Sequence, residues 1–205
     1  ARPVGVAGPD HEAVVSSRPH ERRRVHGTHA RGRGRIGRER FRQRVERLRH
    51  FGSRHVDARH VEVWLPPDYE AKVGAGRRFA VLYMHDGQML FDAKTTWNGK
   101  CWHVDQAAHA LMTQQLARDF IIVGPWNHPA FRHSEYFPAR FLPHLPPPLR
   151  EAFVGEALRG RARSDDYLRF LVEELKPAID TRYATRPERA ACFLMGSSMG
   201  GLISL

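Results

Sequence analysis

The residues with the clearest chemical potential form a G-x-S-x-G pentapeptide near the end of the chain. Gly196, Ser198 and Gly200 occupy its fixed positions, directly after the apolar run of residues 190–195 and before an apolar pair that can begin a helix. Where a strand turns sharply into a helix at such a sequence, the serine hydroxyl is exposed above the sheet and only small residues fit beside it. By register, this context predicts that Ser198, rather than Ser197, is a nucleophile for acyl transfer.

An alternative reading of the same glycines is a turn without catalytic meaning, such as a phosphate-binding loop at a helix N-terminus. No G-K-[ST] follows them, and their spacing differs from G-x-G-x-x-G. The sequence therefore favours a nucleophile over a phosphate site.

Acyl transfer through a serine also requires two hydrogen-bond donors for the oxyanion, one from the residue after the nucleophile and one from the loop after an earlier strand. Met199 supplies the first backbone N–H. The tetrapeptide HDGQ, which ends at Gln88, follows the apolar run 79–84, and Gly87 permits a close backbone approach. The Gln88 N–H is the predicted second donor, whereas His85 is expected to have a structural role in this loop rather than to act as general base.

Buried strands separated by helices must position these groups. Alternating or continuous apolar patterns predict five strands, at residues 45–51, 59–65, 79–84, 120–124 and 190–195. The first of them is expected at an edge of the sheet. Helices are expected at residues 102–116 and from residue 164 to Pro177, which is expected to end the second helix. This order indicates an α/β protein with a mostly parallel sheet flanked by helices.

The long segment of residues 126–163 contains six prolines and no helical periodicity. Loops of this length inside a domain are usually functional or disordered. Asn127, Arg132 and Glu135 lie in it and are candidates for the border of an acyl pocket. An ion pair between Arg132 and Glu135 that fixes the loop is the alternative interpretation.

The net charge of +11 belongs to the start of the chain. Residues 1–50 carry +9 and the remainder carries +2. Residues 1–44 bury too little apolar surface to offset their ordering entropy, so we expect an Arg-rich, disordered tail there. The first 40 residues contain no aromatic side chain for base stacking, which argues against a nucleic-acid partner.

No metal or cofactor is predicted. Cys101 and Cys192 match no metal or haem spacing. His103, Asp105 and His109 also match no known metal site, and a solvated helix face is the simpler interpretation. No apolar run approaches the length of about 18 residues that a membrane span needs. The start lacks the apolar region of a signal peptide, and the sequence predicts no cellular location.

Several motifs taken together resemble the putative esterase family, which includes esterase D-like enzymes, siderophore esterases, feruloyl esterases and mycolyltransferases. The resemblance covers residues 45–205. It rests on VWLPPDY from Val63, VLYMHDGQMLFD from Val81, Asn127 with Arg132, EYFP from Glu135, ELKP from Glu174 and GSSMGG from Gly196. The combination is more specific than any one of these motifs.

The resemblance implies an α/β-hydrolase that cleaves small-molecule carboxylic esters through an acyl-enzyme. In it, Ser198 is the nucleophile, the amides of Gln88 and Met199 bind the oxyanion, and no metal or cofactor takes part. It also implies a catalytic Asp or Glu and then a His, several tens of residues beyond the nucleophile. Only seven residues follow Ser198, so we expect residues 45–205 to be the N-terminal part of the domain, truncated after the nucleophile elbow.

Two other functions stay open. An acyltransferase of the same family uses the same site, and a non-catalytic fragment or pseudoenzyme lacks the acid and the histidine. The 205-residue chain by itself is expected to be inactive. The acyl group, the alcohol and the oligomeric state do not follow from the sequence.

Overall fold

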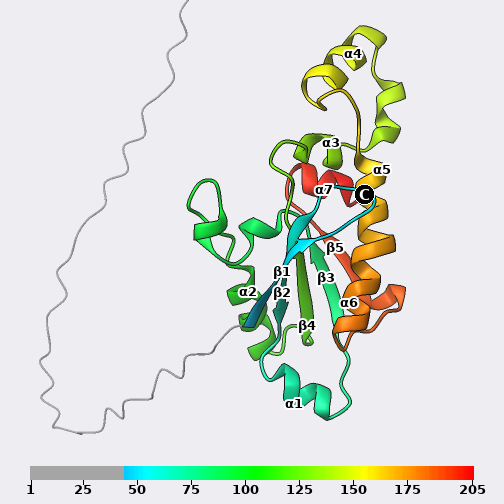
Figure 1. Cartoon of the computed structure of the whole chain (residues 1–205). Coiled ribbons are helices and arrows are strands. Elements are labelled where there is room, and N and C mark those ends of the chain that lie inside the picture. Colours follow the sequence, from blue (N-terminus) through cyan, green and yellow to red (C-terminus); the bar gives the residue numbers. More distant parts are fainter. Residues whose placement is uncertain (1–43) are drawn as a thin grey trace, which may run out of the picture. The chain divides into compact units, whose positions relative to one another are not determined.

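The computed structural model describes residues 44–205 (Figure 1), so the tail predicted for residues 1–44 lies outside the described part except for its last residue. A five-stranded sheet forms the centre of this part, with the strand order β1-β2-β4-β3-β5. The strands are β1 (Arg44–Phe51), β2 (Arg59–Leu65), β3 (Ala80–Met84), β4 (Phe120–Pro125) and β5 (Cys192–Met195). The five predicted strands are confirmed, with β1 at an edge.

The sheet is mixed rather than mostly parallel. β1 pairs antiparallel with β2, and β2 pairs antiparallel with β4. β3 pairs parallel with both β4 and β5. The parallel part is therefore the part that carries the predicted site residues, because Gln88 follows β3 and Ser198 follows β5.

Helices cover both faces of the sheet, as expected for an α/β protein (Figure 1). Alternation along the strands sends neighbouring side chains to opposite faces. Val63 packs with Phe170 and Ile179 in the larger core. Trp64, the next residue along β2, packs with Ala108 in the smaller core on the other face. The larger core lies under α5 (Ser164–Arg169), η4 (Phe170–Leu175) and α6 (Lys176–Arg182), and the smaller lies under α2 (Val104–Thr113).

The segment expected to be a long loop contains short helices instead. They are α3 (Arg132–Tyr136), η3 (Ala139–His144) and α4 (Pro147–Glu156). Prolines stand in the first turn of α4, where a helix needs no amide donor, so the proline cluster begins this helix rather than preventing it. The remaining short helices are α1 (Tyr69–Gly74), η1 (Gly87–Met89), η2 (Ala93–Thr95), η5 (Arg189–Ala191) and α7 (Met199–Ile203).

Pro177 does not end its helix, contrary to the prediction. The helix continues from α5 through η4, which has π-helical geometry, into α6. Pro177 stands in the first turn of α6, directly after the π-helical segment. A change of hydrogen-bond register at this junction accommodates the missing amide and the bulk of the ring.

One edge of the sheet is formed by β5, whose apolar side chains are exposed. Phe193, Leu194 and Met195 have exposed fractions of 54%, 40% and 50%. They line an open groove of about 500 Å³ together with Leu82 and Phe120. No helix among residues 44–205 is long and apolar enough to cross a membrane.

Candidate active site

A tight turn joins β5 to α7 and carries the serine of the G-x-S-x-G motif. β5 ends at Met195 and α7 begins at Met199, so Ser198 stands immediately before the helix. Its backbone has φ 56° and ψ −121°, a conformation that glycine adopts readily and other residues avoid. Ser198 is also exposed. The predicted strand-turn-helix context is present, and the backbone strain falls on Ser198 rather than on Ser197.

The two glycines of the motif face each other across this turn. A Cβ atom on Gly196 would lie 2.8 Å from the Cα of Gly200 and 2.5 Å from its carbonyl oxygen. Both are backbone atoms, which cannot move aside without unfolding the turn. A Cβ on Gly201 would lie 3.2 Å from the Gly196 oxygen. The small residues of the motif are therefore required by the closeness of strand end and helix start.

The amides of Met199 and Gln88 both lie where a helical turn begins. Met199 is the first residue of α7, so its N–H is among those that find no acceptor within the helix. In η1, the amide of Met89 donates to Asp86 O at 2.8 Å and that of Leu90 to Gly87 O at 3.2 Å. The Gln88 N–H precedes these intrahelical bonds.

The turn at η1 packs against the nucleophile elbow. The amide of His85 donates to the Met195 carbonyl at 3.0 Å, which extends the pairing of β3 with β5 into the turns. A Cβ on Gly200 would lie 3.2 Å from the His85 Cβ and 3.5 Å from the Asp86 Oδ2. The structure therefore brings together the two segments that carry Ser198, Met199 and Gln88.

A buried carboxylate stands between these two turns. Asp86 is 2% exposed, and its Oδ1 accepts hydrogen bonds from Arg132 Nε at 2.7 Å and from Asn127 Nδ2 at 2.6 Å. Its Oδ2 accepts from Arg132 Nη2 at 2.8 Å. The first cause of the raised pKa of Arg132 is its hydrogen bond to Asp86, so this guanidinium stays charged.

The ion pair considered between Arg132 and Glu135 does not form. Glu135 accepts from Arg59 Nη1 at 2.8 Å and from Arg59 Nη2 at 2.7 Å. Both residues of this second pair are buried. On the short helix α3, Arg132 binds Asp86 at the start of the η1 turn, whereas Glu135 binds Arg59 on β2, so the two side chains bind partners from different segments.

His85 is buried inside the site and is bonded to a tyrosine. Its Nδ1 lies 2.8 Å from the Tyr167 hydroxyl, and its Nε2 is buried without a hydrogen-bond partner among the described residues. Burial lowers the pKa of His85 to about 4, so the ring is neutral at pH 7. This environment fits a structural role for His85 and provides no orienting carboxylate of the kind that an activated base needs.

Comparison with known proteins places this arrangement in a family. The family model described as "Putative esterase" matches residues 53–205, which include the η1 turn and the elbow. The chain belongs to the putative esterase family.

Solved structures share the fold of this esterase-family chain. The siderophore hydrolase EstB from Aspergillus nidulans is 18% identical with a TM-score of 0.55, over 78% of this chain and 50% of that one. A ferulic acid esterase is 22% identical with a TM-score of 0.51, over 79% and 52%. An IroE-like serine hydrolase from Shewanella oneidensis is 21% identical with a TM-score of 0.51, over 78% and 44%.

This chain therefore spans about half the length of the solved structures it matches. No curated protein sequence matches it. The family and the α/β-hydrolase fold predicted from the motifs are confirmed.

Within residues 44–205, no hydrogen bond joins the Ser198 hydroxyl to a histidine or carboxylate side chain.

Residues 44–205 contain no group of three or more His, Cys, Asp or Glu side chains arranged to hold a metal ion. His103 is exposed but Asp105 is buried, so the solvated helix face predicted for His103, Asp105 and His109 is only partly correct.

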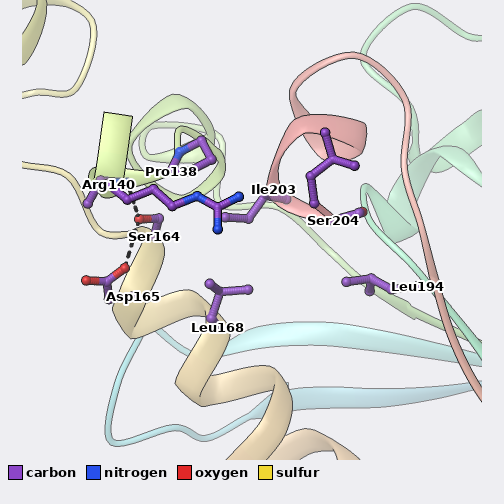
Figure 2. A pocket seen from close by; sticks show the side chains of 10 residues that line it. Pro138, Arg140, Ser164, Asp165, Leu168, Leu194, Ile203 and Ser204 are labelled. Atoms are coloured by element: carbon purple, nitrogen blue, oxygen red, sulfur yellow. Dashed lines mark hydrogen bonds between the residues drawn. The ribbon is translucent and has the colours of Figure 1, made fainter. Parts of the chain in front are cut away.

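A pocket of about 290 Å³ opens beside the C-terminal end of α7 (Figure 2). Leu168, Leu194, Ile203 and Arg140 are among its lining residues, whereas neither Ser198 nor the η1 turn contributes to it. Ser198 precedes the other end of α7, and five residues of helix span about 7 Å. The pocket therefore lies at the opposite end of α7 from Ser198.

Proposed function

We propose that this protein is a carboxylic ester hydrolase with Ser198 as its nucleophile. The observation that carries the proposal is an exposed serine in a backbone conformation that non-glycine residues avoid, at the point where β5 turns into α7. Strained residues of this kind gather at active sites, because only a surrounding structure that demands them keeps them in place. Membership of the esterase family supports the same assignment.

In the proposed reaction, Ser198 Oγ attacks the acyl carbonyl and a general base takes its proton. The carbonyl oxygen becomes an oxyanion, which the N–H groups of Met199 and Gln88 bind. Collapse of this intermediate expels the alcohol, which takes up the proton, and leaves the acyl group esterified to Ser198. Water then attacks the acyl-enzyme in the same way, which releases the carboxylic acid and restores the serine.

The general base and the acid that orients it come, in this proposal, from outside residues 44–205. His85 is a poor substitute, since its Nδ1 is bonded to Tyr167 and its low pKa leaves little basicity. A serine hydroxyl without an adjacent, oriented base is a weak nucleophile at neutral pH. We therefore expect residues 44–205 by themselves to be essentially inactive.

Labelling by a fluorophosphonate probe tests the nucleophile without a choice of substrate. We expect stoichiometric labelling at Ser198 in a form of the protein that carries the base and the acid, and none in residues 44–205 alone. Ser198→Ala abolishes the labelling, whereas the matched variant Ser197→Ala retains it. Labelling that persists in Ser198→Ala would show that the nucleophile is misassigned. Rapid labelling of the short chain that is lost in His85→Ala would show that the base lies within residues 44–205.

The substrates are proposed to be small-molecule esters. Two of the similar structures are named as a ferulic acid esterase and a siderophore hydrolase. The test panel therefore contains methyl ferulate, a siderophore ester and a short-chain aryl ester. Hydrolysis of at least one of these, abolished in Ser198→Ala, is the expected outcome. A typical loss for a removed serine nucleophile is several orders of magnitude in kcat.

A further inference from the structure

The residue before the η1 turn is held in an unusual conformation by charged and polar partners. Asp86 has φ 60° and ψ 46°, the left-handed region that few non-glycine residues occupy. Its amide donates to the Tyr136 hydroxyl at 3.2 Å. Its carboxylate accepts three hydrogen bonds, two of them from Arg132 in a bidentate arrangement. Side-chain contacts thus fix both the backbone and the carboxylate of Asp86.

Asn127 ties the same turn to the end of β4 through a second pair of bonds. Its Nδ2 donates to the Asp86 Oδ1 at 2.6 Å, and its backbone N–H donates to the Gln88 Oε1 at 3.2 Å. The residues on either side of Gly87 are therefore held by one asparagine. The Asp86 Oδ2 also lies 3.5 Å from the place that a Cβ on Gly200 would take, so the carboxylate borders the elbow as well.

We propose that Asp86 is a positioning residue for the oxyanion hole, which holds the Gln88 N–H in place relative to the Met199 N–H through its bonds to Arg132 and Asn127. The inference rests on the proposed function, since it names what aligns the two oxyanion donors of that site. Asp86 itself does not touch the substrate. Its effect on the reaction passes through the backbone of the η1 turn.

The size of the effect follows from how strongly acyl transfer depends on aligned donors. Loss of one oxyanion-hole donor costs about 100- to 1000-fold in kcat, and a misplacement of about 1 Å costs up to about 100-fold. Removal of the Asp86 charge leaves the half-buried Arg132 without its ionic partner and weakens the hydrogen bonds that hold the η1 turn. The Gln88 amide then shifts rather than disappears, so we expect a loss of about 10- to 100-fold.

The test compares Asp86→Asn with the parent in an active form of the protein. We expect kcat to fall by about 10- to 100-fold, with KM changed by less than about threefold. A boronic acid, which forms a tetrahedral adduct on the serine with an oxygen in the oxyanion hole, loses affinity in parallel with kcat/KM. A non-hydrolysable amide analogue, which mimics the ground state, keeps its affinity. A merely structural role would not separate these two ligands.

Glu135→Gln is the matched control. Glu135 lies on α3, as Arg132 does, and forms a buried, bidentate pair with Arg59. The other hydrogen bonds of Arg59 go to the backbone of Asp57 and Trp126 rather than to the η1 turn. We expect Glu135→Gln to lower the thermal midpoint at least as much as Asp86→Asn does, with kcat per folded molecule and boronate affinity unchanged.

A second variant keeps the inference testable if Asp86→Asn does not fold. Asn127→Ala removes the side-chain bond to Asp86 and leaves the charge pair with Arg132, and we expect a loss of about 3- to 10-fold in kcat with the same selective loss of boronate affinity. Unchanged kcat and boronate affinity in the folded variant, or an equal loss in Glu135→Gln, would overturn the positioning role. If instead Ser198→Ala stays active, the proposed function fails whatever the Asp86 variants show.

Discussion

Gly87 packs directly onto the backbone of Gly124, with no room for a side chain on either residue. A Cβ on Gly124 would lie 3.0 Å from the Gly87 Cα, and a Cβ on Gly87 would lie 3.0 Å from the Pro125 carbonyl carbon and closer still to the Gly124 oxygen. The turn that carries the proposed oxyanion donor Gln88 therefore packs against the backbone at the end of β4.

Gly87→Ala is expected to push the η1 turn away from β4. Overpacking against backbone costs about 1–3 kcal/mol of unfolding free energy, and the shifted Gln88 amide lowers the rate of labelling by a fluorophosphonate. Gly155→Ala is the control, because a Cβ at this position of α4 meets nothing within 4 Å. Chemical denaturation measures the loss of stability, and labelling kinetics in an active form of the protein measure the shift of the amide. Equal stability of the two variants would contradict the close packing at Gly87.

The strained backbone of Ser198 predicts that a residue without this strain stabilises the fold, although it removes the hydroxyl. Ser198→Gly and Ser198→Ala both remove the hydroxyl, but only glycine adopts φ 56° and ψ −121° without strain. After the greater flexibility of glycine in the unfolded chain is subtracted, we expect Ser198→Gly to be more stable than Ser198→Ala by about 1 kcal/mol. Thermal unfolding of the two variants provides the comparison, and a more stable alanine variant would argue against a strained elbow.

His85 makes the stability of the fold depend on pH. Its folded-state pKa of about 4 lies below the value of 6.5 for an unperturbed histidine, because burial disfavours the charged ring. Above pH 6.5 neither state binds the proton, so this contribution to stability is complete. As the pH falls from about 6.5 to about 4, the unfolded state binds a proton that the folded state does not, and stability is lost.

We expect the free energy of unfolding to fall by up to about 3 kcal/mol over that range from His85 alone, at about 1.4 kcal/mol for each unit of pKa difference. Denaturation at several pH values measures the slope. The variant His85→Gln retains a polar side chain but has no titrating ring, so its slope between pH 6.5 and 4 should be smaller. An unchanged slope would mean that the acid sensitivity arises from other groups.

The exposed edge of β5 predicts self-association of the isolated chain. Unpaired strand edges with apolar side chains are templates for another strand, and a charge on the edge prevents such pairing. Phe193→Lys is expected to reduce concentration-dependent association in sedimentation velocity experiments. Val172→Lys, which places the same charge at a 65% exposed position on η4, should leave it unchanged. Equal effects of the two variants would point to net charge rather than to the edge.

The strands and the elbow could be predicted because their signals are local. Val61, Val63 and Leu65 alternate toward one face, and the continuous apolar runs of β3 and β4 indicate burial on both. Gly196 and Gly200 are likewise required by close contacts between residues only a few positions apart. Signals of this range survive in a single sequence, since secondary structure periodicity and turn sterics depend on near neighbours.

The partners of the charged residues could not be predicted, because they depend on how distant segments meet. Asp86 stands in the HDGQ motif, but its partner Arg132 follows on another element, and the closeness of Arg132 and Glu135 in sequence suggested the wrong pair. The π-helical turn before Pro177 was equally hidden, since the residue pattern of Phe170–Leu175 is that of an ordinary amphipathic helix. In both cases, tertiary packing determined the result.

The order of the strands also bears on how the protein folds. β5 pairs with β3 alone among the described strands, and Val81 is opposite Cys192. Formation of this pair closes a loop on the order of 100 residues. The entropic cost of closing the loop is offset only after the two strands have paired, which slows folding. The strained turn at Ser198 directly follows β5 and is therefore expected to form late, once β5 has paired with β3. In a partly folded chain Ser198 would follow a strand that is not yet paired, so the proposed nucleophile would reach its strained conformation late in folding.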